Sequence, residues 1–587
     1  MNRIIVGVFV AFLSQMALAG PIGFSKAKSL AESFFNSDEA VGTSSRSKTG
    51  VARYEELYLL DTPTATRSFG DELHPEYYVF APADSIGFVI VAGDDEVSPI
   101  VGYSLDTRYC HHDTPVALKR FLDAYQQYIC DVREGKVEAI KHVSQDVTPV
   151  APLISTTWNQ GYPYNNLCPR IDGKLSLVGC TSVSLAQIMK YYEWPDCGTG
   201  TCSATLSDAE QTTVTTTLET YYDWASMRKS YVSGYTPKQR TAVTTLLRDV
   251  GYACSTIYGL DVTWTYNVDA LKAMLRHFKY SPDIKFVDRR YYSDDTWRSM
   301  MSNELVNGRP IWICGQDENG TGGHSFVCCG IDKSGRYYIN WGWGGNADGY
   351  FDLNAFSPYS YAYNNEQQAL MNIKPIEEGE NAEDFSLIPH VGDVNLLYQI
   401  NQGSPVVEFL IYTTNTSDRT ISGKIGYALY RDGAMLTSGI TELVYYPELL
   451  GNWWYESMSH VSTSELLGLP QGYSEIKFYW QPDGSNEWYE PLGDSHVIYV
   501  TSNESGHYFT KERPENMPNS ISVVSQDVSI CNEEGGISLM ASDARQIDVY
   551  SLNGMLVRSV KLSAGEKVNL RLPNGVYVVG NRRIVVQ

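Results

Sequence analysis

The chain has 587 residues, which is too long for a single hydrophobic core and predicts several domains. Hydrophobic residues make up 43% of it and charged residues 19%, as in globular proteins rather than disordered chains. The formal net charge of -23 argues against nucleic acid or an anionic membrane as the main partner, so we expect no nucleic-acid partner.

Residues 1–19 have the pattern of a secretory signal peptide. A positive charge at Arg3 precedes an apolar stretch over 4–13, and Ala17-Leu-Ala19 fits the cleavage site. A buried N-terminal helix is the alternative. No cysteine follows the cleavage site, which argues against a lipoprotein anchor, and no later run of about 18 apolar residues predicts a membrane span. We therefore expect the mature protein to be exported.

Residues 20–147 are predicted to form a compact α+β unit. Apolar side chains recur at helical spacing over 25–36, and two short strands follow at 77–80 and 87–93. Thr114-Pro115 then opens a second helix, because a cap residue is followed by proline at the first helical position.

A polar linker over 135–150 leads into a second unit, residues 148–376, in which helix and strand patterns mix. The segment after Cys180 is apolar nearly all round, which is typical of a buried central helix, and Pro195 ends it. Strands are predicted at 310–314, 324–331 and 336–340.

A thiol, an imidazole and an amide in this unit have the residue types of an acyl-transfer site. Cys180 stands at the predicted start of its helix, where the helix dipole and unpaired N–H groups favour the reactive thiolate. His324 could accept the thiol proton and later protonate the leaving amine. Asn340 could hold the second ring nitrogen of His324. The order matches the pattern in which a nucleophilic Cys precedes His and Asn by about 130 to 150 residues.

Gln160, upstream of Cys180, is a candidate oxyanion donor. Its side-chain amide could act with the Cys180 backbone N–H to stabilise a tetrahedral oxyanion. Taken alone, however, this residue is better explained as a loop amide.

A metal site built from His324, Cys328 and Cys329 is the competing interpretation. Adjacent cysteines on a strand point to opposite faces, and the chain has no C-x-x-C pair, so we expect neither a metal nor another cofactor. The 11 cysteines leave at least one thiol unpaired, and Cys180 is the candidate. The pairs that could form disulfides are Cys197 with Cys202 and Cys110 with Cys130.

Four motifs resemble those of the streptopain family of secreted bacterial cysteine proteases, and they occur in the family's order. The resemblance covers about residues 20–375. One departure, Thr181-Ser-Val183 where family members often have Val-Ala-Thr, exchanges small residues for small ones. The motifs are Trp158-Asn-Gln-Gly-Tyr-Pro-Tyr-Asn165, Gly179-Cys-Thr-Ser-Val-Ser-Leu-Ala-Gln-Ile-Met-Lys-Tyr-Tyr192, Gly322-Gly-His-Ser-Phe326, and Asn340-Trp-Gly-Trp-Gly-Gly345 with Asp348-Gly-Tyr-Phe351.

The resemblance implies a papain-like fold for residues 148–376 and a role for each candidate. Trp341 would shield the hydrogen bond between Asn340 and His324; its alternative role is core packing. The catalytic residues so implied are Cys180 as nucleophile, His324 as general acid and base, Asn340 as the residue that orients the imidazole, and Gln160 as oxyanion donor.

The same resemblance makes residues 20–147 an inhibitory propeptide. Gly87-Phe-Val-Ile-Val-Ala-Gly-Asp94 and Pro99-Ile-Val-Gly-Tyr-Ser104 are similar to the propeptide that keeps these proteases inactive. Cleavage would then fall between about Lys141 and Pro152. The family also implies a preference for a hydrophobic residue one position before the residue whose carbonyl is attacked.

Beyond the protease resemblance the pattern is all-β. Short alternating strands over 384–505 predict an Ig-like β-sandwich. Its Trp453-Trp-Tyr455 run could contact a substrate or glycan, although core packing is the more ordinary role. Residues 521–587 resemble the C-terminal sorting domains of the Por-type secretion system; the alternative is a small β module without a sorting role.

These observations predict an α+β protein: a propeptide, a papain-like domain, a β-sandwich and a small C-terminal β domain. The predicted function is that of a secreted cysteine endopeptidase, made as a zymogen and linked to virulence. Its partners would be protein substrates, its own propeptide and the secretion machinery, at or beyond the outer-membrane surface of a Gram-negative bacterium. A transglutaminase or amidase would share the triad but would not explain the propeptide-like unit. A catalytically idle surface adhesin is the non-enzymatic alternative.

Overall fold

The computed structural model describes most of the chain from residue 20 onward, so the predicted signal peptide lies outside the described residues. The gaps after residue 20 are 38–56, 64–67, 70–71, 84–85, 141–146, 317–322, 354–364, 400–406, 432, 452, 462–468, 495, 505, 512, 515–516, 518–527, 534–535, 542–544, 552–555, 564–566, 573–574, 580–581 and 587.

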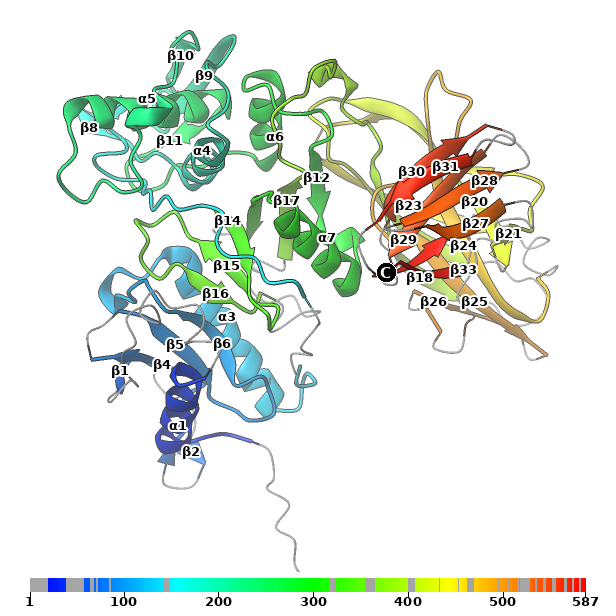
Figure 1. Cartoon of the computed structure of the whole chain (residues 1–587), viewed down its shortest axis with the longest axis horizontal. Helices are drawn as coiled ribbons and strands as arrows, with labels where there is room; N and C mark the ends of the chain where they lie inside the picture. The colour runs from blue at the N-terminus through cyan, green and yellow to red at the C-terminus, as the bar shows by residue number, and fades with distance from the viewer. Residues whose placement is uncertain are drawn as a thin grey trace, which may run out of the picture.

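A 10-stranded sheet runs through the two predicted N-terminal units of the chain (Figure 1). Its order is β1-β4-β5-β6-β16-β15-β14-β13-β17-β12, so strands from the two predicted units share one sheet. The strands are β1 (Leu57–Asp61), β4 (Tyr77–Pro82), β5 (Phe88–Ala92), β6 (Ile100–Ser104), β12 (Lys285–Asp288), β13 (Ile311–Gln316), β14 (Gly323–Ile331), β15 (Tyr337–Asn340), β16 (Gly349–Phe351) and β17 (Asn365–Met371).

The two units join where β6 pairs with β16 in antiparallel register. Tyr103 lies opposite Tyr350, and Gly102 lies opposite Phe351. A Cβ at position 102 would come within 2.6 Å of the Phe351 ring, so only glycine allows the strands this close approach. A continuous sheet, which the sequence did not predict, therefore connects the two units.

Two helices cover opposite faces of the N-terminal part of the sheet. Successive side chains of a strand point to opposite faces, and β4 follows this rule. Tyr78 and Phe80 pack with α1 (Phe24–Phe35), whereas Val79 and Ala81 pack with α3 (Val116–Arg133). Since α3 belongs to the same apolar cluster as β13, β14 and α7 (Asp294–Val306), one core spans the junction of the two units.

The other face of β13 and β14 packs against a helical lobe, which lies above the sheet in Figure 1. Thr236 caps α5 through a capping box with Gln239, and Pro237 occupies the first helical position. The lobe contains α4 (Cys180–Tyr192), α5 (Pro237–Ala253), α6 (Asn267–Arg276), β9 (Thr201–Leu206), β10 (Thr213–Thr217) and β11 (Ile257–Tyr258). Shorter elements of these two units are β2 (Ser68–Phe69), β3 (Glu72–Leu73), β7 (Arg170–Ile171), β8 (Lys174–Leu175), η2 (His111–Asp113), η3 (Trp224–Ser226) and η4 (Arg289–Tyr291).

The C-terminal part is β-rich, as predicted, which confirms the mixed α+β class. One sheet has the order β18-β19-β23, and a second has β21-β20-β24-β25-β26 with β22 paired to β20; side chains of both share one apolar cluster. A last pair of sheets has the orders β27-β28-β31 and β30-β29-β32-β33. The elements are η5 (Ala382–Asp384), β18 (His390–Gln399), β19 (Val407–Asn415), β20 (Ile421–Arg431), β21 (Ala434–Met435), β22 (Thr441–Leu449), β23 (Trp453–Val461), β24 (Gly472–Pro482), β25 (Val497–Asn503), β26 (Gly506–Thr510), β27 (Val528–Glu533), β28 (Gly536–Ala541), β29 (Arg545–Ser551), β30 (Leu556–Leu562), β31 (Lys567–Arg571), β32 (Gly575–Val579) and β33 (Arg582–Val586).

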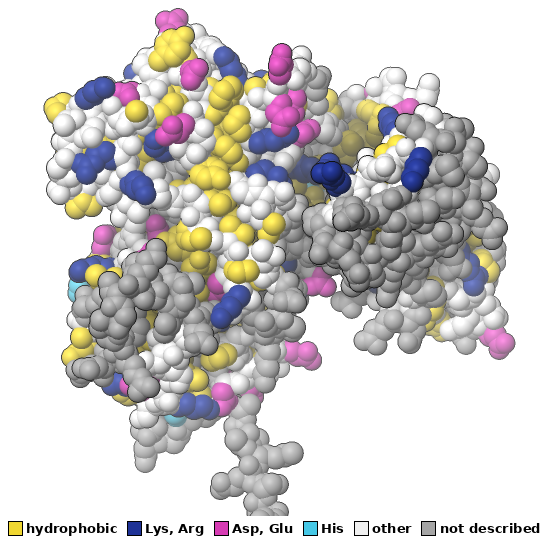
Figure 2. Space-filling model, viewed as in Figure 1, with side chains coloured by type: hydrophobic (Ala, Val, Ile, Leu, Met, Phe, Trp, Pro, Cys, Tyr) yellow, Lys and Arg dark blue, Asp and Glu magenta, His cyan; other side chains and the backbone are white. Residues whose placement is uncertain are grey.

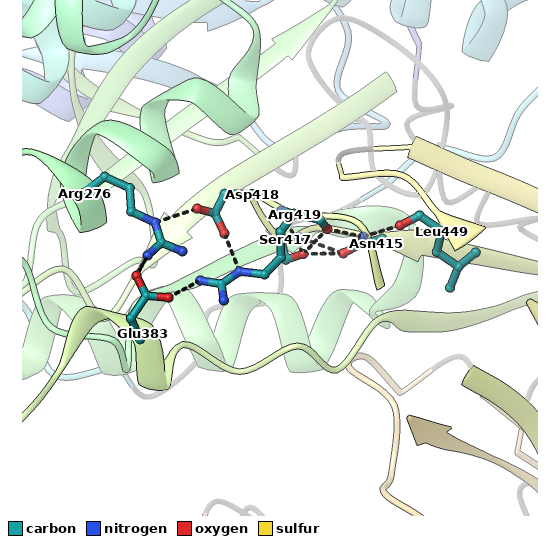
Figure 3. Close-up of polar contacts among 7 residues, drawn as sticks. All are labelled: Arg276, Glu383, Asn415, Ser417, Asp418, Arg419 and Leu449. Carbon is teal, nitrogen blue, oxygen red and sulfur yellow. Dashed lines mark hydrogen bonds and ion pairs between the residues drawn. The ribbon is translucent and has the colours of Figure 1, made fainter. Parts of the chain in front are cut away.

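A network of charges ties α6 to the strands that follow (Figure 3). Arg276 Nε donates to Asp418 Oδ2 at 2.8 Å, and Arg276 also pairs with Glu383. Arg419 pairs with the same two carboxylates, at 3.3 Å to Asp418 and 3.2 Å to Glu383. Because the Asp418 side chain is only 5% exposed, these guanidinium groups supply the hydrogen bonds that water would otherwise provide.

Residues in and next to η4 make a second contact with the β-rich C-terminal part of the chain. His390 is fully buried, with Tyr291 and Tyr292 against it at ring-centroid distances of 5.0 and 5.7 Å. Ser293 donates its N–H and its hydroxyl to the Asp494 carboxylate. Residues 148–376 and the β18–β26 sheets are thus joined by packed and hydrogen-bonded groups as well as by the chain itself.

The surface carries both signs of charge despite the acidic balance. Figure 2 shows Lys and Arg side chains interspersed with Asp and Glu, and a band of hydrophobic side chains down the middle of the left-hand body. Over the described part of the chain, no helix is both long enough and apolar enough to cross a membrane.

We predict that Arg276→Met loosens this junction. The substitution leaves Asp418 with one guanidinium partner instead of two, which should lower the free energy of unfolding of the joined parts by about 1 to 3 kcal/mol. Calorimetry should show the β-sandwich unfolding at a lower temperature than in the wild type. The control is Lys424→Met, which removes an exposed, solvent-screened ion pair with Glu442 and should have a clearly smaller effect. Equal effects of the two substitutions would contradict the prediction.

Candidate active site

Cys180 is the first residue of α4, and the preceding glycine determines how the chain enters the helix. Gly179 has φ 91° and ψ 140°, a backbone conformation that side-chain-bearing residues rarely adopt. A Cβ there would also come within 2.9 Å of Thr263 Cγ2. The thiol therefore stands at the positive end of a buried helix, and the N–H of Cys180 has no acceptor within that helix.

His324 lies on β14, against the start of α4. The hydroxyls of Thr181 and Ser325 are 3.0 Å apart, which ties the residue after the nucleophile to the residue after the histidine. The Cys180 thiol in turn lies close enough to His324 and Ser325 for both residues to lower its pKa. The structure thus brings together the two residues that the sequence predicts as nucleophile and base.

The two groups shift each other's pKa in the directions that thiolate chemistry needs. Burial alone would raise the pKa of Cys180, but the charge and hydrogen bond of His324 outweigh it and lower the pKa from 9.0 to about 7. For His324 burial would lower the pKa, but interaction with Cys180 and the Trp341 carbonyl raises it above 6.5. The pair therefore favours thiolate and imidazolium near neutral pH.

The acceptor behind the imidazole is a backbone carbonyl rather than the predicted amide. His324 Nε2 lies 3.1 Å from the Trp341 carbonyl oxygen, which leaves Nδ1 to face the thiol. Asn340, expected to bond the ring, instead donates Nδ2 to the Thr156 carbonyl at 2.7 Å. Asn340 therefore does not bond the imidazole directly, as expected; it acts on the peptide unit between Trp341 and Gly342.

Asn340 controls the direction of that carbonyl through the next peptide unit. The Gly342 N–H donates to Asn340 Oδ1 at 3.0 Å. This N–H and the Trp341 carbonyl belong to one planar trans peptide, so they point in opposite directions. Holding the N–H on Asn340 therefore aims the Trp341 carbonyl at His324.

The Trp341 ring has a packing role, which the sequence analysis treated as the alternative. It is fully buried and packs against Phe326 and Phe351, each with ring centroids 5.2 Å away. Its Nε1 donates to the Ala347 carbonyl at 3.1 Å, and its backbone N–H donates to Asp348 at 2.9 Å. Burial raises the pKa of Asp348 to about 7.

Gln160 lies beside the chain that leads to the nucleophile. Its backbone carbonyl accepts from the Val178 N–H at 3.0 Å, and its own N–H donates to the Asn159 side chain. This places the residue next to the 177–180 segment, where an oxyanion donor is needed. The role of its side-chain amide remains a proposal.

Sequence reasoning missed Gln187, a fully buried amide on α4 that bonds with Asn340. A long polar amide among the buried positions of the helix, on the same face as Cys180, was the signal available for it. The Trp341 carbonyl was missed for a different reason: every residue has a backbone carbonyl, so the residue type does not reveal which one accepts the bond.

The other cysteines lie apart from this chemistry. Cys328 and Cys329 are fully buried on β14, and burial raises the pKa of both. Among the described residues, no group of three or more His, Cys, Asp or Glu side chains is arranged to hold a metal ion. The two disulfides considered from the sequence, Cys197–Cys202 and Cys110–Cys130, are not formed.

Comparison with known proteins gives two family matches. Residues 158–351 match the peptidase C10 family, and residues 19–129 match the Spi protease inhibitor family. The chain is 25% identical to the thiol protease/hemagglutinin PrtT of Porphyromonas gingivalis over 501 residues, which are 81% of this chain and 55% of that protein. It is 28% identical to streptopain of Streptococcus pyogenes over 317 residues, covering 49% of this chain and 78% of streptopain. The solved structure of interpain A, a cysteine protease of Prevotella intermedia, is 30% identical, with 40% of this chain and 98% of that chain covered and a TM-score of 0.36.

A thiol paired with an imidazole at a helix start, with a carbonyl behind the imidazole, defines the catalytic centre of a cysteine hydrolase. The comparisons make the class specific. The chain belongs to the peptidase C10 family, which confirms the predicted resemblance and the predicted class, a cysteine peptidase.

We predict that the reactivity of Cys180 titrates with a midpoint near pH 7 and that His324→Ala moves this midpoint upward. The thiolate is lost as the pH falls below the Cys180 pKa of about 7. Without His324, burial outweighs the remaining interaction with Ser325, and the midpoint should rise to about 9 or above. The measurement is the iodoacetamide alkylation rate of the Cys180 peptide against pH, followed by mass spectrometry. His277→Ala is the control, since that ring contacts Cys202 and Thr199 instead; an unchanged midpoint in His324→Ala would refute the pairing.

Proposed function

We propose that this chain is a secreted cysteine endopeptidase, made as a zymogen, that hydrolyses peptide bonds of extracellular proteins. The observation that carries the proposal is the Cys180–His324 pair at the head of α4. The Spi protease inhibitor match over residues 19–129 supports the zymogen. No cofactor enters the reaction.

In the proposed reaction the Cys180 thiolate attacks the peptide carbonyl. The oxyanion that forms accepts hydrogen bonds from the Cys180 N–H and the Gln160 side-chain amide. His324, as imidazolium, then protonates the leaving amine, and an acyl-enzyme remains. Water attacks the acyl-enzyme with neutral His324 as base, which releases the acid and regenerates the thiolate.

Residues 20–147 act as the inhibitory propeptide in this proposal. Besides pairing β6 with β16, they contact the loop that follows Trp341. The Ala347 N–H donates to the Arg108 carbonyl at 2.8 Å, and Trp343 Nε1 donates to Asp113 at 3.3 Å. The propeptide thereby touches the segment whose carbonyl holds His324.

Maturation cleavage belongs on the N-terminal side of Val150. The predicted interval from Lys141 to Pro152 lies partly outside the described residues. Val150 exchanges backbone hydrogen bonds of 2.8 and 2.9 Å with Ile331 on β14, so its peptide groups are already paired within the catalytic part. A protease needs an extended, unpaired segment, and residues 147–149, which belong to no helix or strand, satisfy that need better.

Aromatic residues next to the nucleophile support a preference for hydrophobic substrates. Thr263 Oγ1 donates to the Leu177 carbonyl at 3.1 Å, which holds the 259–266 segment against the entry to α4. On that segment Trp264 is 43% exposed and Tyr266 59% exposed. These rings can bury apolar side chains of a bound peptide.

The remaining domains concern delivery rather than chemistry. The signal peptide at 1–19 would direct export, and residues 521–587 would engage a Por-type secretion machinery at the outer membrane of a Gram-negative bacterium. The Ig-like β-sandwich at 384–505 would travel with the enzyme into its extracellular, virulence-related setting. The idle-adhesin alternative is disfavoured because Cys180 and His324 are paired with shifted pKa values that binding alone does not need.

We predict that, under reducing conditions, residues 20–587 shorten themselves before Val150 and hydrolyse casein. Cys180→Ala should stay full length and lose at least about 1,000-fold of the casein activity, since the nucleophile is gone. Gel electrophoresis with N-terminal sequencing and a fluorescent casein assay measure the two effects. Ser182→Ala, on the same helix and with a hydroxyl that makes no hydrogen bond, should behave as wild type. Processing and casein hydrolysis by Cys180→Ala at the wild-type rate would refute the proposal.

We predict that deletion of 521–587 leaves the protein in the periplasm, because the sorting signal is removed. Cell fractionation with immunoblotting measures this. Fusion of 521–587 to a periplasmic reporter should carry the reporter to the surface, which separates a sorting role from a folding defect. Normal surface delivery of the deleted chain would show that the tail is only a small β module.

A further inference from the structure

We infer that Gln187 is a positioning residue for the proposed proteolysis, joining the helix of the nucleophile to the segments that hold the imidazole and the oxyanion donor. The inference rests on the proposed function. It concerns an amide that never reaches substrate and acts through its hydrogen bonds to other groups.

Gln187 and Cys180 lie on one face of α4. They are about two helical turns apart, so their side chains leave the helix in nearly the same direction. Ser184 lies between them and donates its hydroxyl to the Cys180 carbonyl at 2.7 Å. Gln187 is fully buried, so every polar atom of its amide must find a partner inside the protein.

The amide finds its partners on two other segments. Gln187 Oε1 accepts from the Thr156 hydroxyl at 2.9 Å, from the Trp158 N–H at 3.1 Å and from Asn340 Nδ2 at 3.3 Å. Gln187 Nε2 donates to Asn340 Oδ1 at 3.0 Å. All of these partners are buried.

The bonds with Asn340 lead to the imidazole. The two side-chain amides face each other, which fixes where Asn340 Oδ1 lies. That oxygen holds the Gly342 N–H, and the same peptide unit presents its carbonyl to His324. A shift of Asn340 would therefore turn the acceptor away from Nε2 and reduce the stabilisation of the imidazolium.

The bonds with Thr156 and Trp158 lead to the oxyanion side. Trp158 precedes Gln160 by two residues, and its carbonyl accepts from the Gly344 N–H at 3.0 Å. Gln187 thus holds the chain just before Gln160 while its own helix carries Cys180. One side chain connects the three segments whose relative placement sets the attack geometry.

The residue type follows from this arrangement. Glutamine supplies an acceptor and a donor at the end of a two-carbon side chain. Glutamate of the same size keeps the acceptors but loses the donor to Asn340, and leucine loses both. A purely structural amide would cost stability when removed but would leave the pH dependence of the thiol unchanged.

The experiment compares wild type, Gln187→Leu, Gln187→Glu and Ser182→Ala in the chain of residues 20–587. For Gln187→Leu we expect kcat on casein-derived peptides to fall about 10- to 100-fold while KM changes less than about threefold. The midpoint of Cys180 alkylation should rise by about one pH unit, because His324 loses a fixed acceptor. Gln187→Glu should lie between wild type and Gln187→Leu, and Ser182→Ala should match wild type.

Circular dichroism and thermal melting confirm that each variant is folded; if Gln187→Leu does not fold, the isosteric Gln187→Glu carries the test. A folded Gln187 variant with wild-type kcat and an unshifted midpoint would overturn the inference. A wild-type chain without peptide hydrolysis, but with a midpoint that Gln187 variants shift, would refute the proposed function and leave the positioning role standing.

Discussion

The active site depends on a pair of charged groups, the Cys180 thiolate and the His324 imidazolium, in surroundings where burial disfavours charge. Burial disfavours both the Cys180 thiolate and the His324 imidazolium, yet each makes the other favourable. That exchange works only at close range, and the two residues come from different elements of the same unit, the start of α4 and strand β14. The surrounding features, from Gly179 before the helix to the Thr181–Ser325 hydrogen bond, keep Cys180 and His324 close together.

Sequence reasoning succeeded where a residue type and a local pattern carry the chemistry. A cysteine heading an apolar helix predicts a thiolate, and a histidine on a strand after two glycines predicts its partner. The alternating strands were likewise predictable from the spacing of their apolar residues. The helix predicted to open with Thr114 as cap and Pro115 at the first helical position instead begins at Val116, without a side-chain cap. The orienting group was assigned one peptide unit away from its true place, because the Trp341 carbonyl is identical to every other carbonyl in the chain. Gln187 was missed because its partners come from distant segments.

The division into units was also only partly readable. Linker composition separates residues 20–147 from 148–376, and no local pattern reports that β6 and β16 pair. Strand pairing between units depends on which edges remain available after each has folded, and a sequence read in order does not encode that directly. At the level of individual residues, the pairing is reflected in the close approach of Gly102 to Phe351.

That shared sheet has a consequence for the timing of activation. Cutting the linker before Val150 breaks one covalent bond, but the β6–β16 ladder and the apolar core around α3 stay intact. A severed propeptide would therefore remain as a bound second chain, and latency would decay with its dissociation or digestion rather than with the cut. The enzyme would then respond to dilution. At high concentration, near the site of synthesis, the propeptide would stay bound and the enzyme inhibited; after dilution the propeptide would dissociate and the enzyme would become active.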